Sequence, residues 1–410
     1  MARSTRPAFD VVVAGGGMVG ASLAAALAPL PLKVLVVEPH PPSSRTQPSY
    51  DDRATAVSEG SRRILEGIDC WSPVAPRAAP IREIHVSERG RFGATRLKAV
   101  EHGLGSFGHV VENRALGAAL WSRLGACPGV ECWSPATVEG IEDLRDSVRV
   151  TVAREGAKPV RVVARLLVAA DGARSRLREM AGIGHESRDY GQVALIANVT
   201  PTRDAAGTAY ERFTPDGPLA VLPLTDGRVT VVWTVSPAEA ESVSALDDDG
   251  FRDALQAAFG HRLGRFVRVG GRAAYPLSLV QAGAWYAGRL VLAGNSAHGI
   301  HPVAGQGFNL GLRDVAALAE LVAADPQDDP GRPGLLAEYA AWREEDRRET
   351  IRYTDGLVRL FTSPLGPVRL ARALGLVGLE LLPPARSALV RRGAGLAGRL
   401  PRLSLGQPLS

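Results

Sequence analysis

The sequence has little cysteine, little lysine and few aromatic residues, and each shortage excludes a class of protein. Its 410 residues include only three cysteines, without metal-ligand spacing. This excludes a disulfide framework or a zinc module and predicts a reducing cytosol. Aromatic residues make up 5% of the chain, and the basic residues form no aromatic-studded strand or recognition helix. We therefore expect neither a metal site nor a nucleic-acid partner.

Long apolar runs without interruption are also missing. The uncharged run from Val11 to Leu32 follows Arg3 and Arg6, as in a signal peptide or a membrane helix. Three consecutive glycines and two prolines in this run would break such a helix, and the run divides into strand, turn, helix and strand. The charged fraction of 22% and the net charge of +5 are typical of a globular chain. Its length of 410 residues allows roughly two or three domains.

The segment from Phe9 to Glu38 has the pattern of a dinucleotide-binding unit. A short apolar strand leads into residues 15–20 (GGGMVG), which fit G-x-G-x-x-G, and an Ala- and Leu-rich helix follows. In this pattern Gly15 allows a tight turn, Gly17 lets the backbone approach a pyrophosphate, and Gly20 lets the helix pack close to the strand. The free N–H groups at the start of the helix would bind the pyrophosphate.

An acidic residue follows at the distance that this unit requires. Glu38 ends the second apolar run, eighteen residues after Gly20 (38 − 20), where a carboxylate can accept hydrogen bonds from ribose hydroxyls. The same glycine pattern recurs over residues 393–398. There it follows two arginines rather than a strand, and no second strand or acid comes after it, so we interpret it as a chance match. The N-terminal segment thus predicts dinucleotide binding.

The rest of the chain predicts an α/β fold with an inserted second sheet. An apolar run before Asp171-Gly172 places this acid at the carboxyl end of a strand, where ligands bind in α/β sheets. Residues 190–235 contain four strand candidates, with a tight turn at Asp226-Gly227, and indicate an antiparallel sheet. Parallel-sheet texture returns over residues 289–295, before a long helix. We also expect helices over residues 54–65 and 244–259.

Three motifs stand in one order over most of the chain: the glycine fingerprint, Asp171-Gly172, and the segment from Gly294 to Asn309. Together they resemble the flavin-dependent aromatic hydroxylases of the p-hydroxybenzoate hydroxylase type. More narrowly, the chain is similar to the ubiquinone-biosynthesis hydroxylases, and among these most similar to the 2-polyprenyl-6-methoxyphenol hydroxylases. The segments that carry this similarity are IHVSERGRFG, VVENRALG, DYGQVALIANV, YERFTPDGPLAVLPL and HPVAGQGFNLGLRD.

The resemblance implies FAD as cofactor and assigns residues to it by position. Asn295 is a departure, because the wider family has Asp there, although the methoxyphenol branch commonly shows Asn; its amide keeps hydrogen-bonding capacity without charge. By the same resemblance, Gly15, Gly17 and Gly20 would bind the pyrophosphate, and Glu38 would bind the adenosine ribose. Arg53 and Arg114 would contact the phosphate and ribityl region, and Asp171 would lie at the edge shared with the nicotinamide cofactor. The isoalloxazine ring would be lined by Pro302, Gly305, Gly307 and Asn309.

The implied activity is hydroxylation of a polyprenylated methoxyphenol ring in ubiquinone biosynthesis, with NAD(P)H and O2, through a flavin C4a-hydroperoxide. The sequence does not choose between NADH and NADPH.

No catalytic base is identified: His298 and His301 adjoin the flavin segment, but a loop histidine bound to the backbone is the commoner case. Leu222-Pro223-Leu224 is either a wall of the ring pocket or an ordinary edge strand. The alternatives are a related hydroxylase acting at another ring position or on a catabolic phenol, and a non-catalytic FAD-bound scaffold in a quinone-biosynthesis complex.

These patterns give a domain division. Residues 1–75, 100–185 and 280–340 are expected to form the FAD-binding domain, residues 76–99 and 186–279 the substrate-binding sheet, and residues 341–410 a basic helical segment. From Gly356 onward eight arginines face one acid, a net of 8 − 1 = +7, and residues 368–382 have helical periodicity. This segment is either a cap on the FAD domain or a docking site for an anionic membrane. We expect a cytoplasmic protein, with the open alternative of peripheral contact at the inner face of the membrane and with other ubiquinone-biosynthesis proteins.

Overall fold

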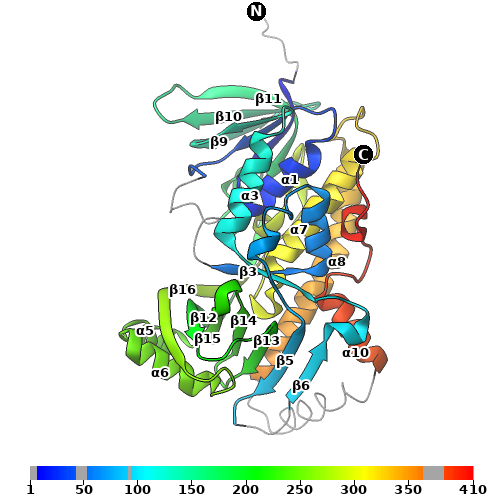
Figure 1. The fold of residues 1–410 in the computed structure, drawn as a ribbon. Helices are drawn as coiled ribbons and strands as arrows, with labels where there is room; N and C mark the ends of the chain where they lie inside the picture. The colour runs from blue at the N-terminus through cyan, green and yellow to red at the C-terminus, as the bar shows by residue number, and fades with distance from the viewer. Residues whose placement is uncertain (1–6, 43–52, 91–93, 363–382, 410) are drawn as a thin grey trace, which may run out of the picture.

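The computed structural model describes residues 7–42, 53–90, 94–362 and 383–409. Figure 1 shows a nucleotide-binding region with its own sheet at one end of the molecule and a second large sheet at the other end. The long helices α7 (Gln306–Ala323) and α8 (Pro333–Thr362) run side by side between the two. The α/β class with an inserted sheet, expected from the sequence, is confirmed.

The first sheet is mainly parallel and has the strand order β17-β18-β11-β1-β2-β8. The fingerprint lies between β1 and α1, and β1 pairs in parallel with both β2 and β11. The bounds of this sheet are β1 (Phe9–Ala14), β2 (Val34–Val37), β8 (Val130–Trp133), β11 (Val160–Ala169), β17 (Tyr286–Ala287) and β18 (Leu290–Leu292), with β9 (Ala136–Asp143) and β10 (Val148–Arg154) attached through β11.

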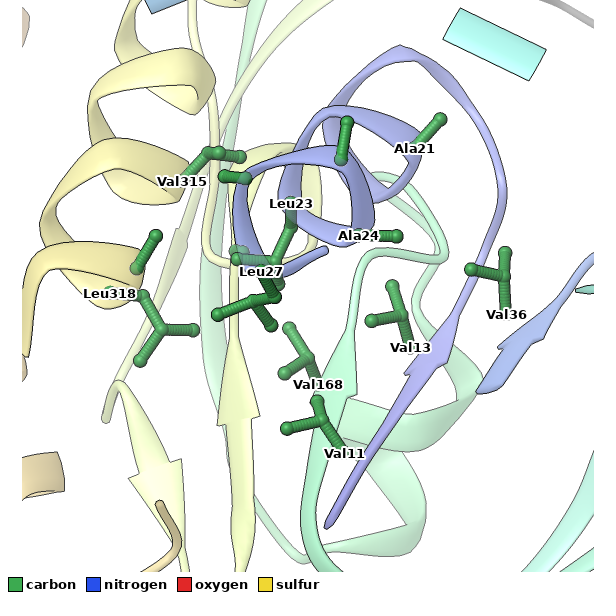
Figure 2. Packing of buried hydrophobic residues seen from close by; sticks show 14 of the residues in the cluster. Val11, Val13, Ala21, Leu23, Ala24, Leu27, Val36, Val168, Val315 and Leu318 are labelled. Carbon is green, nitrogen blue, oxygen red and sulfur yellow. The ribbon is translucent and has the colours of Figure 1, made fainter. Parts of the chain in front are cut away.

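The core of this region forms where α1 (Met18–Leu27) and α7 pack on the strands. Figure 2 shows Val11 and Val168 of the sheet below Leu27 of α1, with Leu318 of α7 beside it. All four are at most 1% exposed. Branched residues on adjacent parallel strands give α1 a continuous apolar surface, and its many alanines let it approach closely. α3 (Asn113–Gly125) packs against α1 as well, and α4 (Arg176–Met180) follows β11.

The second sheet has the order β19-β16-β12-β15-β14-β13-β5-β6. It joins strands from residues 83–98 to strands from residues 185–299, as the proposed insertion requires. Asp226 and Gly227 both have φ near +70° (65° and 74°) in the turn between β14 and β15, as a tight hairpin turn requires. The bounds are β5 (Glu83–Glu88), β6 (Ala94–Lys98), β12 (His185–Pro201), β13 (Thr208–Phe213), β14 (Pro218–Pro223), β15 (Val229–Val235), β16 (Phe266–Ala282) and β19 (His298–Gly299).

Two expected helices have other bounds in the structure, and one strand was not expected. Residues 54–58 form the strand β3 (Ala54–Ser58) and not a helix, because they pair with β7 (Gly108–Glu112), which also pairs with β4 (Ala79–Pro80). The helix α2 (Glu59–Gly67) begins only after Ser58, whose side chain caps it. Residues 244–259 belong to two helices, α5 (Pro237–Ser244) and α6 (Asp248–Phe259). The long strand β16 was not expected at all.

The C-terminal segment caps the nucleotide-binding region, in the part that the structure describes. After α10 (Pro383–Gly393), the carbonyl of Ala394 accepts a hydrogen bond from Gly60 N (2.9 Å), and the carbonyl of Arg399 accepts one from Trp342 Nε1 (3.0 Å). The expected amphipathic helix over residues 368–382 lies outside the described residues. In the described ranges, no helix combines the length and the apolar character needed to cross a membrane.

Candidate functional site

A cavity of about 1950 Å³ lies between the two large sheets. Pockets for a single small ligand reach about 1,000 Å³, so this one has room for a dinucleotide and a second molecule. Gly20 and Arg114 do not line it, and Arg114 is exposed on α3. The other ten residues assigned to the cofactor do: Gly15, Gly17, Glu38, Arg53, Asp171, Asn295, Pro302, Gly305, Gly307 and Asn309.

The fingerprint glycines are held by close backbone approaches. Gly15 has φ 102°, and a Cβ there would lie 2.4 Å from the carbonyl oxygen of Ala170. A Cβ on Gly20 would lie 1.9 Å from the carbonyl oxygen of Gly15, so only glycine lets α1 pack this close to β1. Gly17 precedes α1. Within residues 7–42, the first turn of that helix has neither a capping side chain nor an acid, so its N–H groups are available to an anion.

Glu38 is buried at the end of β2 and organises the fingerprint. Its carboxylate accepts hydrogen bonds from Gly16 N (2.6 Å) and His40 N (2.9 Å). Burial raises the pKa of Glu38, and these N–H groups partly offset the rise. Trp121 Nε1 donates to the carbonyl of Gly16 (3.0 Å) from α3. Glu38 therefore fixes the turn in addition to facing the cavity.

Asp171 lies where β11 ends, as the sequence predicts. Its Oδ2 accepts a hydrogen bond from Leu177 N at 3.2 Å, which orients the carboxylate at the start of α4. Its Oδ1 is buried and has no hydrogen-bond partner in the described part of the chain. A buried carboxylate oxygen is seldom left unpaired, so Oδ1 is suited to accept a hydrogen bond from a bound molecule in the cavity.

Asp314, which no sequence motif indicates, binds the backbone of the Gly294-Asn295 segment. It lies in α7 and is fully buried, and it accepts hydrogen bonds from Gly294 N (2.9 Å), His298 Nε2 (2.7 Å) and Arg343 Nε (2.6 Å). Burial alone would raise the pKa of Asp314, but its interactions with His298 and Arg343 outweigh this effect and lower the pKa. The available signal was the adjacent charged pair Arg313-Asp314 in the otherwise apolar middle of a helix.

Asn309 and Gly305 set the start of α7. The Asn309 side chain accepts a hydrogen bond from Ser58 N (2.9 Å) and donates to the carbonyls of Ala56 (2.8 Å) and Gly305 (2.6 Å), so it ties β3 to α7. Gly305 has φ 61° and precedes the helix. In the described residues the first turn of α7 has no acid. Gly305 and residues 306–309 line the cavity, so the positive end of α7 faces it.

Neither histidine beside this segment lines the cavity. His298 belongs to the Asp314 network. His301 is 1% exposed, its Nδ1 accepts a hydrogen bond from Val303 N (3.1 Å), and burial lowers the pKa of its imidazole to about 4. The interpretation of His301 as a loop histidine bound to the backbone is therefore correct.

The opposite wall of the cavity comes from the second sheet. It is mostly apolar, and Leu222 belongs to it. Glu211 of this sheet and Tyr353 of α8 are polar lining residues that no sequence motif reveals. The second glycine match also lines the cavity, through Gly393 and Gly398. It forms the end of α10 and a turn, without a preceding strand, so its interpretation as a chance match to the fingerprint is consistent with the fold. Other apolar members of the sheet wall are Ile84, Val86, Leu97, Ala209, Phe213, Ala220 and Val232.

Comparison with known proteins agrees with this geometry. Residues 8–354 match the family described as the FAD binding domain. The chain belongs to this family. It is 40% identical to the ubiquinone hydroxylase UbiL of Rhodospirillum rubrum, over 98% of this chain and 93% of that protein. It is 33% identical to the 3-demethoxyubiquinol 3-hydroxylase of Escherichia coli, over 95% of this chain and 98% of that protein.

Solved structures of the family share the fold. The crystal structure of the p-nitrophenol 4-monooxygenase PnpA of Pseudomonas putida superposes with a TM-score of 0.79 at 20% identity, over 95% of this chain and 98% of that one. The protein is thus a flavin-dependent hydroxylase with FAD as its cofactor, and NAD(P)H is the reductant typical of the family. The residues present fit FAD: the first turn of α1 behind Gly17 has no capping side chain and no acid, and Oδ1 of Asp171 has no hydrogen-bond partner among the described residues.

Proposed function

We propose that this protein hydroxylates the phenolic ring of a polyprenylated ubiquinone precursor, using FAD, NAD(P)H and O2. The observation that carries the proposal is one continuous cavity with the dinucleotide fingerprint at one wall and an apolar sheet face at the other. A polyprenyl chain has only apolar surface, which Ile84, Leu97 and Leu222 can bury. The similarity to ubiquinone hydroxylases over nearly the whole chain supports the same substrate class.

In this proposal the fingerprint holds the pyrophosphate of FAD on the free N–H groups at the start of α1, and Glu38 binds the adenosine ribose. Arg53 lines the cavity with its guanidinium 4.7 Å from the centre of the Tyr275 ring, placed for the phosphate and ribityl region. The role of Arg114 in the same region stays a prediction. Asp171 and Asn295 accept or donate hydrogen bonds along the cofactor.

The segment from Pro302 to Asn309 then lines the isoalloxazine ring. FAD, when bound, supplies the transfer of electrons from NAD(P)H to O2 and the delivery of one oxygen atom to the ring. The protein contributes position and environment. The start of α7 directs its positive end at the negative charge of the reduced cofactor, and the apolar sheet wall excludes water from the reacting ring.

A weak contact with an anionic membrane is a further part of the proposal, because a polyprenylated substrate partitions into lipid. The described arginines of the C-terminal segment give it limited support. Arg386, Arg392 and Arg399 are paired with Glu101, Glu349 and Glu338, which is the arrangement of a cap. Salt-sensitive sedimentation with vesicles that contain acidic lipid would support docking, and binding that ignores lipid charge would exclude it.

The quinone intermediate that accumulates in a strain without this gene tests the proposed function most informatively. We expect a polyprenylated ring that lacks one hydroxyl group, and its structure identifies the ring position. Normal ubiquinone levels in that strain would argue for a catabolic phenol as substrate. Restoration of ubiquinone by an Asp171→Ala variant without hydroxylase activity would point instead to a scaffold role.

A further inference from the structure

One ionisable side chain on the sheet wall of the cavity has a carboxylate oxygen without a hydrogen-bond partner among the described residues. Glu211 lies in β13 and lines the cavity. Its Oε1 is enclosed by protein, with no hydrogen-bond partner in the described residues, whereas Oε2 is not enclosed in this way. Buried carboxylate oxygens are nearly always paired, and an unpaired one in a ligand cavity marks a candidate functional group.

Neither residue directly opposite Glu211 on the two paired strands is charged. Val86 of β5 and Ala220 of β14 lie directly across from it, and side chains directly opposite share one face of a sheet. No ion pair joins Glu211 to any described residue. Burial raises the pKa of its carboxyl to about 7, far above that of a solvated glutamate. A glutamate in this setting changes between acid and base close to neutral pH.

Tyr353 interacts electrostatically with Glu211 and belongs to a helix that contacts the flavin segment. It lines the same cavity from α8, a helix that packs against the turn Val303–Gly305. Burial and then the negative charge of Glu211 raise the pKa of Tyr353 to about 12, so its hydroxyl remains a donor at neutral pH. From α10, Arg391 and Arg392 also line the cavity, and Arg392 is paired with Glu349.

We propose that Glu211 is the general base that takes the proton from the phenolic hydroxyl of the substrate. This inference rests on the proposed function and deepens it, because it assigns the base that the motifs leave unassigned. Free phenols ionise near pH 10 and are mostly neutral at pH 7. A ring attacks an electrophilic oxygen far better as a phenolate, so a base of matched pKa beside the hydroxyl accelerates the reaction.

The proposed hydroxylation step conserves protons and electrons. The phenolic O–H bond breaks as an O–H bond forms on Glu211, and the electron pair left on the phenolic oxygen enters the ring. The ring carbon then forms the new C–O bond to one oxygen atom of O2 as the O–O bond breaks, and the second oxygen atom leaves as water. When that carbon loses its own proton and the ring becomes aromatic again, Glu211 returns its proton to the phenolic oxygen. Overall, ring C–H, O2, NAD(P)H and one proton give ring C–OH, water and NAD(P)⁺.

The test uses FAD-loaded Glu211→Gln, which keeps the shape and removes the base. With 2-methoxy-6-prenylphenol as probe, NAD(P)H oxidation, hydroxylated product and hydrogen peroxide are measured between about pH 5 and 9. In the wild type, product formation should rise with an inflection near pH 7. In the variant, product per NAD(P)H should fall at least about tenfold without that inflection, while FAD content is unchanged and hydrogen peroxide increases.

Two variants and one spectrum complete the design. Glu83→Gln removes the same charge from the neighbouring strand, at a position that does not line the cavity, and should behave as wild type. Glu211→Asp should restore part of the product. The infrared carbonyl band of a protonated carboxyl should titrate near pH 7 in the wild-type holoenzyme and be absent in Glu211→Gln. An unchanged pH profile and unchanged coupling in Glu211→Gln would overturn the assignment. Lack of product from the wild type with every prenylated phenol would overturn the proposed function itself.

Discussion

Two glutamates line the cavity, and burial raises the pKa of both. Glu38 has two backbone N–H partners, which partly offset the rise. Glu211 has none in the described chain, so the full effect of burial remains. Two carboxylates in different environments are therefore suited to different roles, a binding group and a base. The sequence predicts Glu38, since the fingerprint fixes its distance. It cannot predict Glu211, which looks like an ordinary surface glutamate between Tyr210 and Arg212 until the strands pair.

Replacing Glu38 by alanine should weaken FAD binding without unfolding the chain. The variant loses charge-assisted hydrogen bonds to the ribose and to Gly16 N, a loss of roughly 1–3 kcal/mol, or about 5- to 150-fold in Kd. Titration of apoprotein with FAD measures this. Glu131→Ala, at an exposed position on the adjacent strand β8, is the matched control and should bind FAD normally. An unchanged Kd in Glu38→Ala would show that Glu38 is only a structural strand end.

The Glu211→Gln variant should also be more stable than wild type at alkaline pH. The folded-state pKa of Glu211 is raised from an ordinary 4.5 to about 7, so the folded protein resists ionisation that the unfolded chain permits. Wild-type stability therefore falls relative to the variant as pH rises through this window, by on the order of 2–3 kcal/mol at pH 8 and little at pH 5. Urea unfolding at fixed FAD concentration measures the difference. Equal stabilities at both pH values would mean that Glu211 is solvated.

At the scale of elements, local patterns predict α1 and the strands beside it, because turn glycines and apolar runs are adjacent in the sequence. The strands β3 and β16 are not predicted, because the strands that pair with them are distant in the sequence. β3 pairs with β7, and β16 pairs with β12 despite the strand-weakening pair Gly270-Gly271. Asp314 is another long-range feature, since Gly294, His298 and Arg343 come from three different elements.

Gly20→Ala should separate α1 from β1. The added Cβ would overlap the carbonyl oxygen of Gly15, and backbone on both sides cannot yield cheaply. We expect a loss of about 3 kcal/mol or more in the free energy of unfolding, together with loss of FAD. Gly125→Ala makes the same change in helix α3, where a Cβ meets nothing within 4 Å, and should be neutral or stabilising by up to about 1 kcal/mol. Normal flavin content in Gly20→Ala would contradict the close-packing account.

At the scale of the molecule, the sequence predicts a nucleotide-binding region interrupted by a second sheet, and the structure confirms it. It offers a cap on the FAD domain as one alternative for the C-terminal segment, but it does not predict the contacts after α10, where Gly395 lies against Ser58 and the carbonyl of Ala394 accepts a hydrogen bond from Gly60 N. Such contacts join residues more than three hundred positions apart, and no local pattern encodes them. They close the cavity over the cofactor side and leave the apolar sheet wall for the substrate.

Oxygen isotope labelling tests the central claim most directly. FAD-loaded protein would be given NAD(P)H, 2-methoxy-6-prenylphenol and ¹⁸O2, and the product examined by mass spectrometry. A flavin-dependent hydroxylase should insert one ¹⁸O atom into the ring for each product molecule, in step with NAD(P)H oxidation. A yellow, fully folded protein that oxidises NAD(P)H only to hydrogen peroxide with every prenylated phenol, or a product whose new oxygen comes from water, would contradict the account.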